Sequence, residues 1–148
     1  MTRNEGGVEI RAFAYPEDYA AVYDLWSRSG PGVQVGRSDT PDEIIKKLQH
    51  DPDLFLVAEV DGHLVGTVIG GFDGRRGMVY HLAVSPGLRQ LGVGTALMAE
   101  LEQRLIQKGC LKSYLMVTRD NPDAMRFYTG IGWERMDVEV ALFCKELE

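Results

Sequence analysis

The chain has 148 residues, 45% of them hydrophobic and 26% charged, which is the balance of a single globular domain with enough material for a core. Its formal net charge of −6 counts against a nucleic-acid or membrane partner held by bulk charge. No apolar run in the sequence approaches the roughly 20 residues that span a bilayer. The two cysteines, Cys110 and Cys144, follow no metal-ligand or disulfide spacing, so we expect reduced thiols, no metal site and a cytoplasmic location.

The first third of the chain predicts one strand and two helices. Residues 1–7 are polar and glycine-bearing, and we expect them to be disordered. Alternating polarity predicts a strand over Val8–Phe13. Apolar side chains at helical spacing predict a helix that begins at Pro16. A glycine-rich loop over Gly30–Asp39 then leads to a second helix, for which Thr40 is the predicted N-cap.

The middle of the chain predicts three consecutive strands. The first two, Leu54–Val60 and His63–Phe72, flank Asp61-Gly62, a pair that is typical of a type I′ hairpin turn. Glycines inside the second strand predict a bulge or the close approach of another backbone, at Gly66, Gly70 and Gly71. The third strand, Met78–Val84, is apolar almost throughout, as expected of a central strand.

A long helix is predicted after Gly94, with Leu97, Met98, Leu101 and Leu105 on its apolar face and Gly109 at its end. Four elements are predicted after it: a strand over Ser113–Thr118, a helix over Pro122–Tyr128, and strands over Trp133–Met136 and Val138–Lys145. The order β-α-α-β-β-β-α-β-α-β-β predicts one α/β (α+β) domain over residues 1–148. We expect a mixed sheet of about seven strands with about four helices on its faces.

The stretch from Leu82 to Thr95 joins the central strand to the long helix through a glycine-rich loop. Unpaired N–H groups at a helix N-terminus favour an anion, most often phosphate, and glycines let it approach the backbone closely. The Walker loop needs Gly-Lys followed by Ser or Thr, and the sequence has no such triplet. The dinucleotide loop needs a small residue where Leu97 stands and an acidic one near Lys112. An ordinary glycine-rich turn is a further alternative.

A third phosphate pattern, Arg-x-x-Gly-x-Gly, is matched by Arg89, Gly92 and Gly94. A second block of matching positions lies downstream, at Asn121, Ala124, Phe127, Tyr128, Gly132 and Trp133. Together the two blocks resemble those of the GNAT superfamily of N-acetyltransferases, in particular small single-domain bacterial members such as the ribosomal-protein N-terminal acetyltransferases. The resemblance implies the GNAT fold, with a mostly antiparallel sheet, and acetyl-CoA as the cosubstrate.

The resemblance also implies a role for particular residues. The residues implied in cofactor binding are Leu82, Ala83, Val84, Arg89, Gln90, Leu91, Gly92, Val93, Gly94, Thr95, Asn121, Phe127 and Tyr128. In catalysis, the backbone N–H of Leu82 or Ala83 would polarise the thioester carbonyl, a form of oxyanion stabilisation. Tyr128 would donate a proton or a hydrogen bond to the departing thiolate. Asn121 would contact the pantetheine arm, cap the helix that follows it, or do both.

The group that accepts the proton of the amine remains open. Ribosomal-protein-type members carry a Glu where this chain has Met116, and histone-type members carry a Glu where it has Tyr80. The remaining candidates are Glu59, His81, Asp73 and a chain of water molecules. Imidazole is the side chain whose ordinary charge change lies nearest neutral pH. Strict alternation, however, places His81 opposite Tyr80 and Leu82, where it can simply pack beneath a helix.

The resemblance implies transfer of acetyl from acetyl-CoA to a primary amine of a small molecule or peptide. Direct attack within a ternary complex fits, because neither cysteine lies in the motif. The acceptor would be bound by the loop Gly30–Asp39, the helix start at Thr40 and a hairpin near Met136–Glu139. Two alternatives stay open: a non-catalytic coenzyme A-binding module or sensor, and a tRNA-directed toxin-type acetyltransferase, which the acidic balance disfavours. We expect no nucleic-acid or membrane partner, and a monomer or homodimer.

Overall fold

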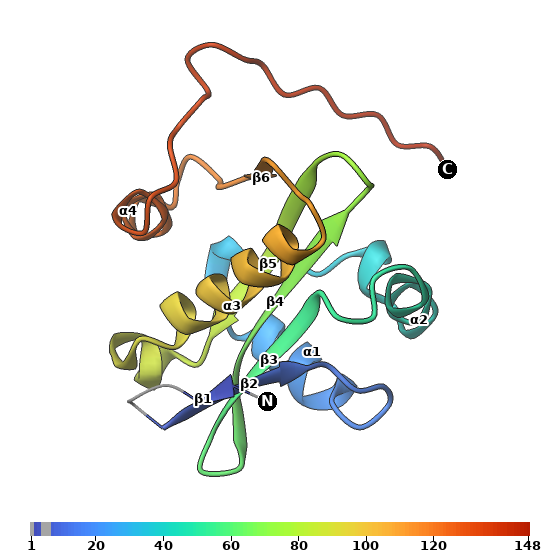
Figure 1. Cartoon of the computed structure of the whole chain (residues 1–148), viewed down its shortest axis with the longest axis vertical. Coiled ribbons are helices and arrows are strands. Elements are labelled where there is room, and N and C mark those ends of the chain that lie inside the picture. Colours follow the sequence, from blue (N-terminus) through green and yellow to red (C-terminus); the bar gives the residue numbers. More distant parts are fainter. Residues whose placement is uncertain (1, 4–6) are drawn as a thin grey trace.

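The computed structural model describes residues 2–3 and 7–148, and within them one six-stranded sheet has the order β1-β2-β3-β4-β5-β6 (Figure 1). The strands are β1 (Thr2–Arg3), β2 (Val8–Ala12), β3 (Phe55–Val60), β4 (His63–Phe72), β5 (Gly77–Val84) and β6 (Ser113–Leu115). Neighbouring strands from β1 to β5 are antiparallel, and β6 is parallel to β5. The predicted mixed, mostly antiparallel sheet is therefore confirmed.

Four α-helices and three 3-10 turns complete the described chain. The helices are α1 (Tyr19–Ser27), α2 (Pro41–His50), α3 (Val93–Gln107) and α4 (Pro122–Gly130), and the turns are η1 (Gly30–Gly32), η2 (Arg37–Asp39) and η3 (Pro86–Leu91). The N-terminus of α2 is as predicted, because the Thr40 hydroxyl accepts a hydrogen bond from the Glu43 N–H at 3.5 Å. The predicted loop Gly30–Asp39 contains both η1 and η2.

Thr2 and Arg3 are more ordered than the composition indicates. Thr2 and Arg3 pair with Ile10 and Glu9 of β2, so the prediction of disorder is wrong for these two residues. Residues 1 and 4–6, which the same prediction covered, lie outside the described residues. Pairing with an existing strand supplies backbone hydrogen bonds that composition does not reveal.

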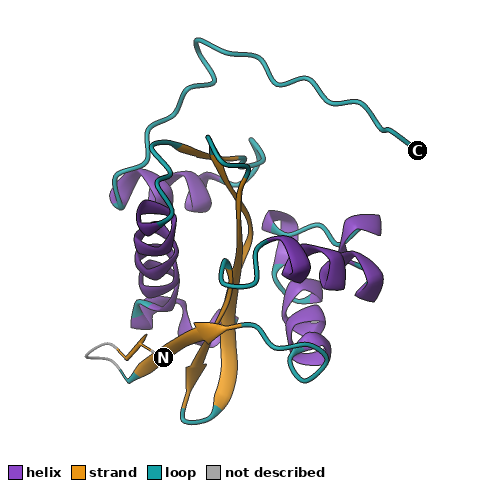
Figure 2. Cartoon of the chain, turned by 45° about the vertical axis from the view of Figure 1, so that its right-hand side comes forward, coloured by secondary structure: helices purple, strands orange, loops and turns teal. Residues whose placement is uncertain are grey.

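Helices cover both faces of the sheet (Figure 2). α3 lies on one face, and α1 and α2 lie on the other. The predicted apolar face of α3 is confirmed, since Leu97, Met98, Leu101 and Leu105 are all buried. The glycines of β4 permit this close packing: a Cβ on Gly66 would lie 2.8 Å from a methyl group of Val93.

The predicted β3–β4 hairpin is confirmed in its detail. Asp61 and Gly62 have φ angles of +51° and +78°, the left-handed pair that a type I′ turn requires. The register of β4 shifts twice, once against β3 and once against β5, so the predicted irregularity is present. The second shift is the one that shapes the candidate site.

The C-terminal part of the chain differs from the prediction. β6 ends at Leu115 rather than Thr118, and neither Trp133–Met136 nor Val138–Lys145 forms a strand, so the described sheet has six strands rather than about seven. The N–H groups of Glu139 and Val140 bond to the carbonyl of Met136 in a turn, after which the chain runs away from the body (Figure 1). A strand pattern becomes a strand only where an edge is available to pair with it.

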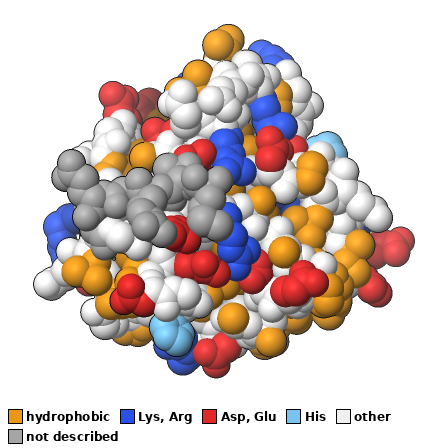
Figure 3. Space-filling model, turned by 60° about the horizontal axis from the view of Figure 1, so that its bottom comes forward, with side chains coloured by type: hydrophobic (Ala, Val, Ile, Leu, Met, Phe, Trp, Pro, Cys, Tyr) orange, Lys and Arg blue, Asp and Glu red, His pale blue; other side chains and the backbone are white. Residues whose placement is uncertain are grey.

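Within the described residues, no helix is both long and apolar enough to cross a membrane. On the face drawn in Figure 3, acidic, basic and hydrophobic side chains are interspersed rather than gathered by charge.

Candidate active site

β5 and β6 separate along their length and leave one edge of β5 open. The pairing between them covers only Gly77–Val79 opposite Ser113–Leu115, whereas β5 continues to Val84. Within the described chain, the β6-side edge of β5 therefore has no strand partner from Tyr80 onward. An open strand edge presents backbone N–H and C=O groups to whatever extended group lies along it.

A β-bulge shapes β5 at this opening. Ile69 of β4 pairs with Tyr80 and Thr67 pairs with Ala83, so His81 and Leu82 together oppose a single residue of β4. His81 adopts a left-handed conformation, with φ of +50°, which is uncommon for a side chain other than glycine or asparagine. Backbone in this region is strained, and such strain gathers at functional sites.

The bulge overturns the expected direction of His81. Tyr80 lies against the α2 side of the sheet, because a Cβ on Gly71 would be 4.0 Å from the Tyr80 ring and 3.4 Å from Lys47 of α2. The His81 ring lies on the same side, with its centroid 5.1 Å from that of Trp26 of α1. Alternation predicted opposite faces for these two neighbours, and the extra residue of the bulge is the reason that prediction is wrong.

His81 is held by a buried carboxylate. Its Nε2 lies 3.0 Å from Oδ1 and 3.1 Å from Oδ2 of Asp39, the last residue of η2. Asp39 also accepts a hydrogen bond from the Gly36 N–H at 2.9 Å, and its carbonyl accepts one from the Tyr19 hydroxyl at 2.8 Å. Asp39 and His81 lie 42 positions apart in the sequence, so no local pattern could have paired them.

The glycine loop behaves as an open helix N-terminus. Gly92, with φ of +77°, ends η3 and starts α3, and within the described chain no side chain caps that helix and no acidic residue lies in its first turn. Thr95 and the predicted phosphate residues Arg89, Gln90 and Leu91 are exposed, whereas Val93 and Gly94 are buried. The Nε of Arg89 donates to the Val84 carbonyl at 3.4 Å, which ties the loop to the end of β5.

α4 brings the second motif against the first. The side chain of Asn121 accepts from the Ala124 N–H at 3.2 Å, so its predicted capping role is confirmed. A Cβ on Gly94 would lie 3.3 Å from the ring of Phe127, and the ring centroids of Phe127 and Tyr128 are 5.1 Å apart. Tyr128 and Leu82 both pack against the core on the α3 side of the sheet.

Tyr128 occupies an environment that keeps its proton in place. Burial raises the pKa of Tyr128 to about 12, because a phenolate loses hydration there. Its hydroxyl has no hydrogen-bonding partner among the described residues, so the O–H is available to a ligand. A buried, neutral hydroxyl is suited to donating a hydrogen bond rather than to releasing a proton freely.

The α1–α2 loop reaches across to α4. A Cβ on Gly32 would lie only 2.9 Å from the side-chain nitrogen of Asn121, so this glycine permits the contact. The loop in which the sequence placed acceptor binding therefore borders the same opening as the second motif. The predicted hairpin near Met136–Glu139 is only a turn, and it brings no strand to the site.

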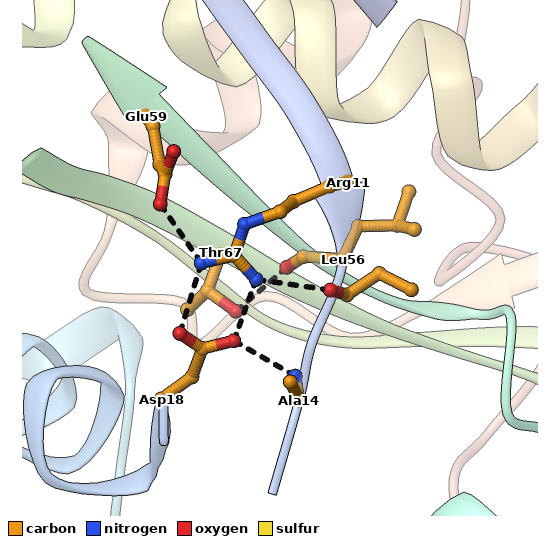
Figure 4. Close-up of polar contacts among 7 residues, drawn as sticks. Arg11, Ala14, Asp18, Leu56, Glu59 and Thr67 are labelled. Carbon is orange, nitrogen blue, oxygen red and sulfur yellow. Dashed lines mark hydrogen bonds and ion pairs between the residues drawn. The ribbon is translucent and has the colours of Figure 1, made fainter. Parts of the chain in front are cut away.

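Glu59, one candidate base, is committed to a structural ion network (Figure 4). Arg11 donates to both carboxylate oxygens of Asp18, at 2.7 and 2.9 Å, and to Oε1 of Glu59 at 2.8 Å. Burial alone would raise the pKa of Asp18, but hydrogen bonds from Arg11 and the Ala14 N–H outweigh it and lower that pKa. The network joins β2 and β3 to the start of α1.

Asp73, another candidate, lies at the wrong end of β5. Its carboxylate accepts hydrogen bonds from the N–H groups of Arg75 and Arg76, both at 2.8 Å, and those bonds lower its pKa. Five residue-to-residue steps along β5 lead from Gly77 to Leu82, which is about 16 Å along a strand. Asp73 therefore shapes the β4–β5 turn.

Comparison with known proteins agrees with this geometry. A model of the acetyltransferase (GNAT) family matches residues 19–133. A curated acetyltransferase of Pectobacterium atrosepticum is 45% identical over 130 residues, which is 88% of this chain and 90% of that protein. A second one, of Photorhabdus laumondii, is 43% identical over 95% of this chain and 96% of its own length.

A solved structure extends the comparison to three dimensions. Ard1 from Thermoplasma volcanium is similar with a TM-score of 0.74 and 29% identity, over 85% of this chain and 82% of its own. These likenesses favour the enzymatic hypothesis over a module without catalysis. The chain belongs to the GNAT acetyltransferase family and is an acetyl-CoA-dependent acyltransferase.

Proposed function

We propose that this protein transfers acetyl from acetyl-CoA to a primary amine of a small molecule or peptide, by direct attack within a ternary complex. The observation that carries the proposal is the open edge of β5, which continues to Val84 although its pairing with β6 ends at Val79. The N-terminus of α3, which no described side chain caps, follows β5 in the chain, and Tyr128 packs against the core on the α3 side of the sheet.

The donor would occupy this opening in two parts. The pantetheine arm would lie along Leu82–Val84 and pair with the backbone as an added strand does. The pyrophosphate would lie over the loop from Arg89 to Thr95, where the N–H groups of the first turn of α3 point outward and the helix dipole favours negative charge. Arg89 uses its Nε on the Val84 carbonyl, which leaves its terminal nitrogens for phosphate.

The reacting carbonyl would lie beside the bulge. A backbone N–H of Leu82 or Ala83 would donate to the thioester oxygen and stabilise the negative charge that develops on it. Tyr128 would donate its hydrogen bond to sulfur as the C–S bond breaks. Its raised pKa keeps it neutral for this task over the whole physiological range.

The acceptor would enter from the α1–α2 side, where the loop Gly30–Asp39 borders the opening. The PaiA N-acetyltransferase of Thermoplasma acidophilum, with a TM-score of 0.76 and 21% identity, shares the fold and was solved with coenzyme A, which supports coenzyme A as the carrier of the donor group. Which amine this chain accepts is a property of its own loops.

The test combines a binding and a turnover measurement. Calorimetry with coenzyme A should show binding that Arg89→Ala weakens by about tenfold, since one charge-assisted contact contributes about 1.5 kcal/mol. A thiol-release assay with acetyl-CoA and a panel of small amines, polyamines and peptides should identify an acceptor. Coenzyme A binding without release of thiol for any acceptor in the panel would contradict the proposal, and so would the absence of binding.

A further inference from the structure

The geometry points to His81 as the general base that takes the proton from the acceptor amine, with Asp39 as the residue that positions it. This inference rests on the proposed function and adds the one group that the family resemblance leaves unassigned. Neither Glu59 nor Asp73 competes for the role, because Arg11 and the β4–β5 turn engage them.

The contact with Asp39 selects a tautomer of the imidazole. An ionised carboxylate only accepts hydrogen bonds, and both oxygens of Asp39 lie within 3.1 Å of Nε2. Nε2 therefore carries the hydrogen in the neutral ring, and Nδ1 keeps a lone pair. Asp39 is itself fixed by the Gly36 N–H at 2.9 Å, so the ring has a defined orientation. A base aligned by a third group in this way is the arrangement that enzymes use to direct imidazole.

The location fits the same role. The peptide unit after His81 carries the N–H of Leu82, which is proposed to polarise the thioester. Because of the bulge, the His81 side chain points to the α1–α2 side while Leu82 packs on the α3 side. An amine that approaches from the α1–α2 side would thus meet the imidazole and the carbonyl at neighbouring residues. Only 21% of the His81 side-chain surface is exposed, which limits competition from water.

The ionisable groups around His81 are few. η2 contributes Asp39, which contacts the ring. α1 contributes Tyr19, whose hydroxyl donates to the carbonyl of Asp39, and β5 itself contributes Tyr80. On α2, Lys47 and Asp51 lie beside Tyr80 and pair with each other at 2.8 Å. β4 has no ionisable side chain between Leu64 and Phe72. Asp39 is therefore the charged group in direct contact with the ring among the described residues.

The reaction balances with these groups. His81 takes one proton from the ammonium form of the acceptor at Nδ1 and passes it to solvent. The nitrogen lone pair then forms the C–N bond, and the C–S bond breaks with its electron pair on sulfur. Nitrogen loses its second proton to solvent as the amide forms, and the thiolate, which accepts a hydrogen bond from the Tyr128 hydroxyl, gains one proton from solvent. The products are the amide, coenzyme A with a free thiol, and one proton.

The central experiment compares acceptors that do and do not need a base. His81→Asn is chosen because asparagine tolerates a positive φ, so the bulge is retained. With n-butylamine, which is an ammonium ion near neutral pH, kcat/KM should fall about 10²-fold, within the usual range for proton transfer catalysis. With methoxyamine, whose electron-withdrawing oxygen lowers the basicity of the nitrogen so that it is largely neutral at the same pH, kcat/KM should change less than about threefold. Equal losses with both nucleophiles would overturn the inference and indicate a structural role.

A second variant tests the positioning role of Asp39. In Asp39→Asn the side chain no longer presents two acceptor oxygens to Nε2, so kcat/KM with n-butylamine should fall while kcat/KM with the neutral nucleophile is retained. A purely structural loss would lower kcat/KM for both nucleophiles alike. Nitrogen NMR gives a readout free of turnover: of the three histidines, the signals lost in His81→Asn should show a hydrogen on Nε2. A hydrogen on Nδ1 of the neutral ring would refute the inference.

The two proposals fail in different ways. If the wild-type protein releases no thiol with any amine, the proposed function and this inference are both overturned. If the wild-type protein is active and His81→Asn keeps its rate with n-butylamine, only the inference is overturned. Thr67→Ser, a buried substitution on the facing strand, serves as a matched control and should leave both rates within about threefold.

Discussion

The hydroxyl of Tyr128 offers the sharpest test of how the leaving group is handled. Tyr128→Phe removes only the oxygen, and no described residue bonds to it, so the fold should be unaffected. A thiol has an ordinary pKa of about 8.5, and Tyr128 has one of about 12, so complete proton transfer to a thiolate is opposed by about 5 kcal/mol. In the proposed mechanism, the hydroxyl would therefore act mainly as a hydrogen-bond donor to developing negative charge.

The size of the effect follows from that role. A hydrogen bond to a charged group contributes about 1.5–3 kcal/mol, which corresponds to a rate loss of about 10- to 150-fold. We expect kcat of Tyr128→Phe to fall by about 10²-fold in a thiol-release assay at saturating acetyl-CoA and amine. The wild-type rate should not decline through ionisation of Tyr128 until the pH approaches its pKa of about 12.

Tyr23→Phe is the matched control, because Tyr23 lies on α1 and is 42% exposed. It should leave kcat unchanged within about twofold, and thermal unfolding of both variants should match the wild type within about 2 °C. An unchanged kcat in Tyr128→Phe would refute the reasoning. A change confined to KM would also refute it, since that would mean the hydroxyl serves binding and not the transition state.

Three further outcomes are expected. Glu59→Gln should leave kcat within about threefold in the thiol-release assay, because Arg11 and not the substrate engages Glu59, and a loss near 10²-fold would restore Glu59 as the base. The pKa of Tyr128 is raised in the folded state, so the contribution of its neutral phenol to the free energy of unfolding is complete below about pH 10 and is lost as the pH rises toward 12. Urea titrations near pH 12 should therefore show that the free energy of unfolding falls by about 2–3 kcal/mol more in the wild type than in Tyr128→Phe. Deletion of residues 138–148 removes an exposed ion pair between Arg37 and Glu146 at 3.4 Å and two turn hydrogen bonds to the Met136 carbonyl, so the midpoint of thermal unfolding should move by less than about 3 °C. A larger fall, or a change of mass in light scattering, would mean that this segment pairs with a sheet in solution.

Local signals predicted most of the elements correctly. The Asp61-Gly62 turn, the Thr40 cap and the apolar face of α3 depend on neighbours within a few positions, and all three are confirmed. The same holds for Asn121, whose side chain caps the helix that it precedes. The motif residues were found for the same reason, since Gly92 and Gly94 meet backbone requirements that a linear pattern records.

The prediction of a strand over Val138–Lys145 is wrong because a strand forms only where a neighbouring strand is available to pair with it. Val138–Lys145 has the composition of a strand, yet Val138 is 88% and Phe143 91% exposed. β6 is only three residues long, so it offers little edge to pair with. Strand formation depends on what lies opposite, and sequence patterns carry no record of that.

The sequence by itself determined the elements of the proposed donor site: the open helix N-terminus after Gly92 and the aromatic pair on α4 follow from residues that act through local backbone and short spacing. Only the tertiary structure decided the arrangement on the side of the sheet where the acceptor is proposed to enter. The single extra residue of the bulge turns His81 to the same side as Tyr80, and chain folding brings Asp39 to within 3.0 Å of it. A bulge depends on how two strands register against each other, and the contact depends on how η2 packs on the sheet, so neither is written in any local pattern.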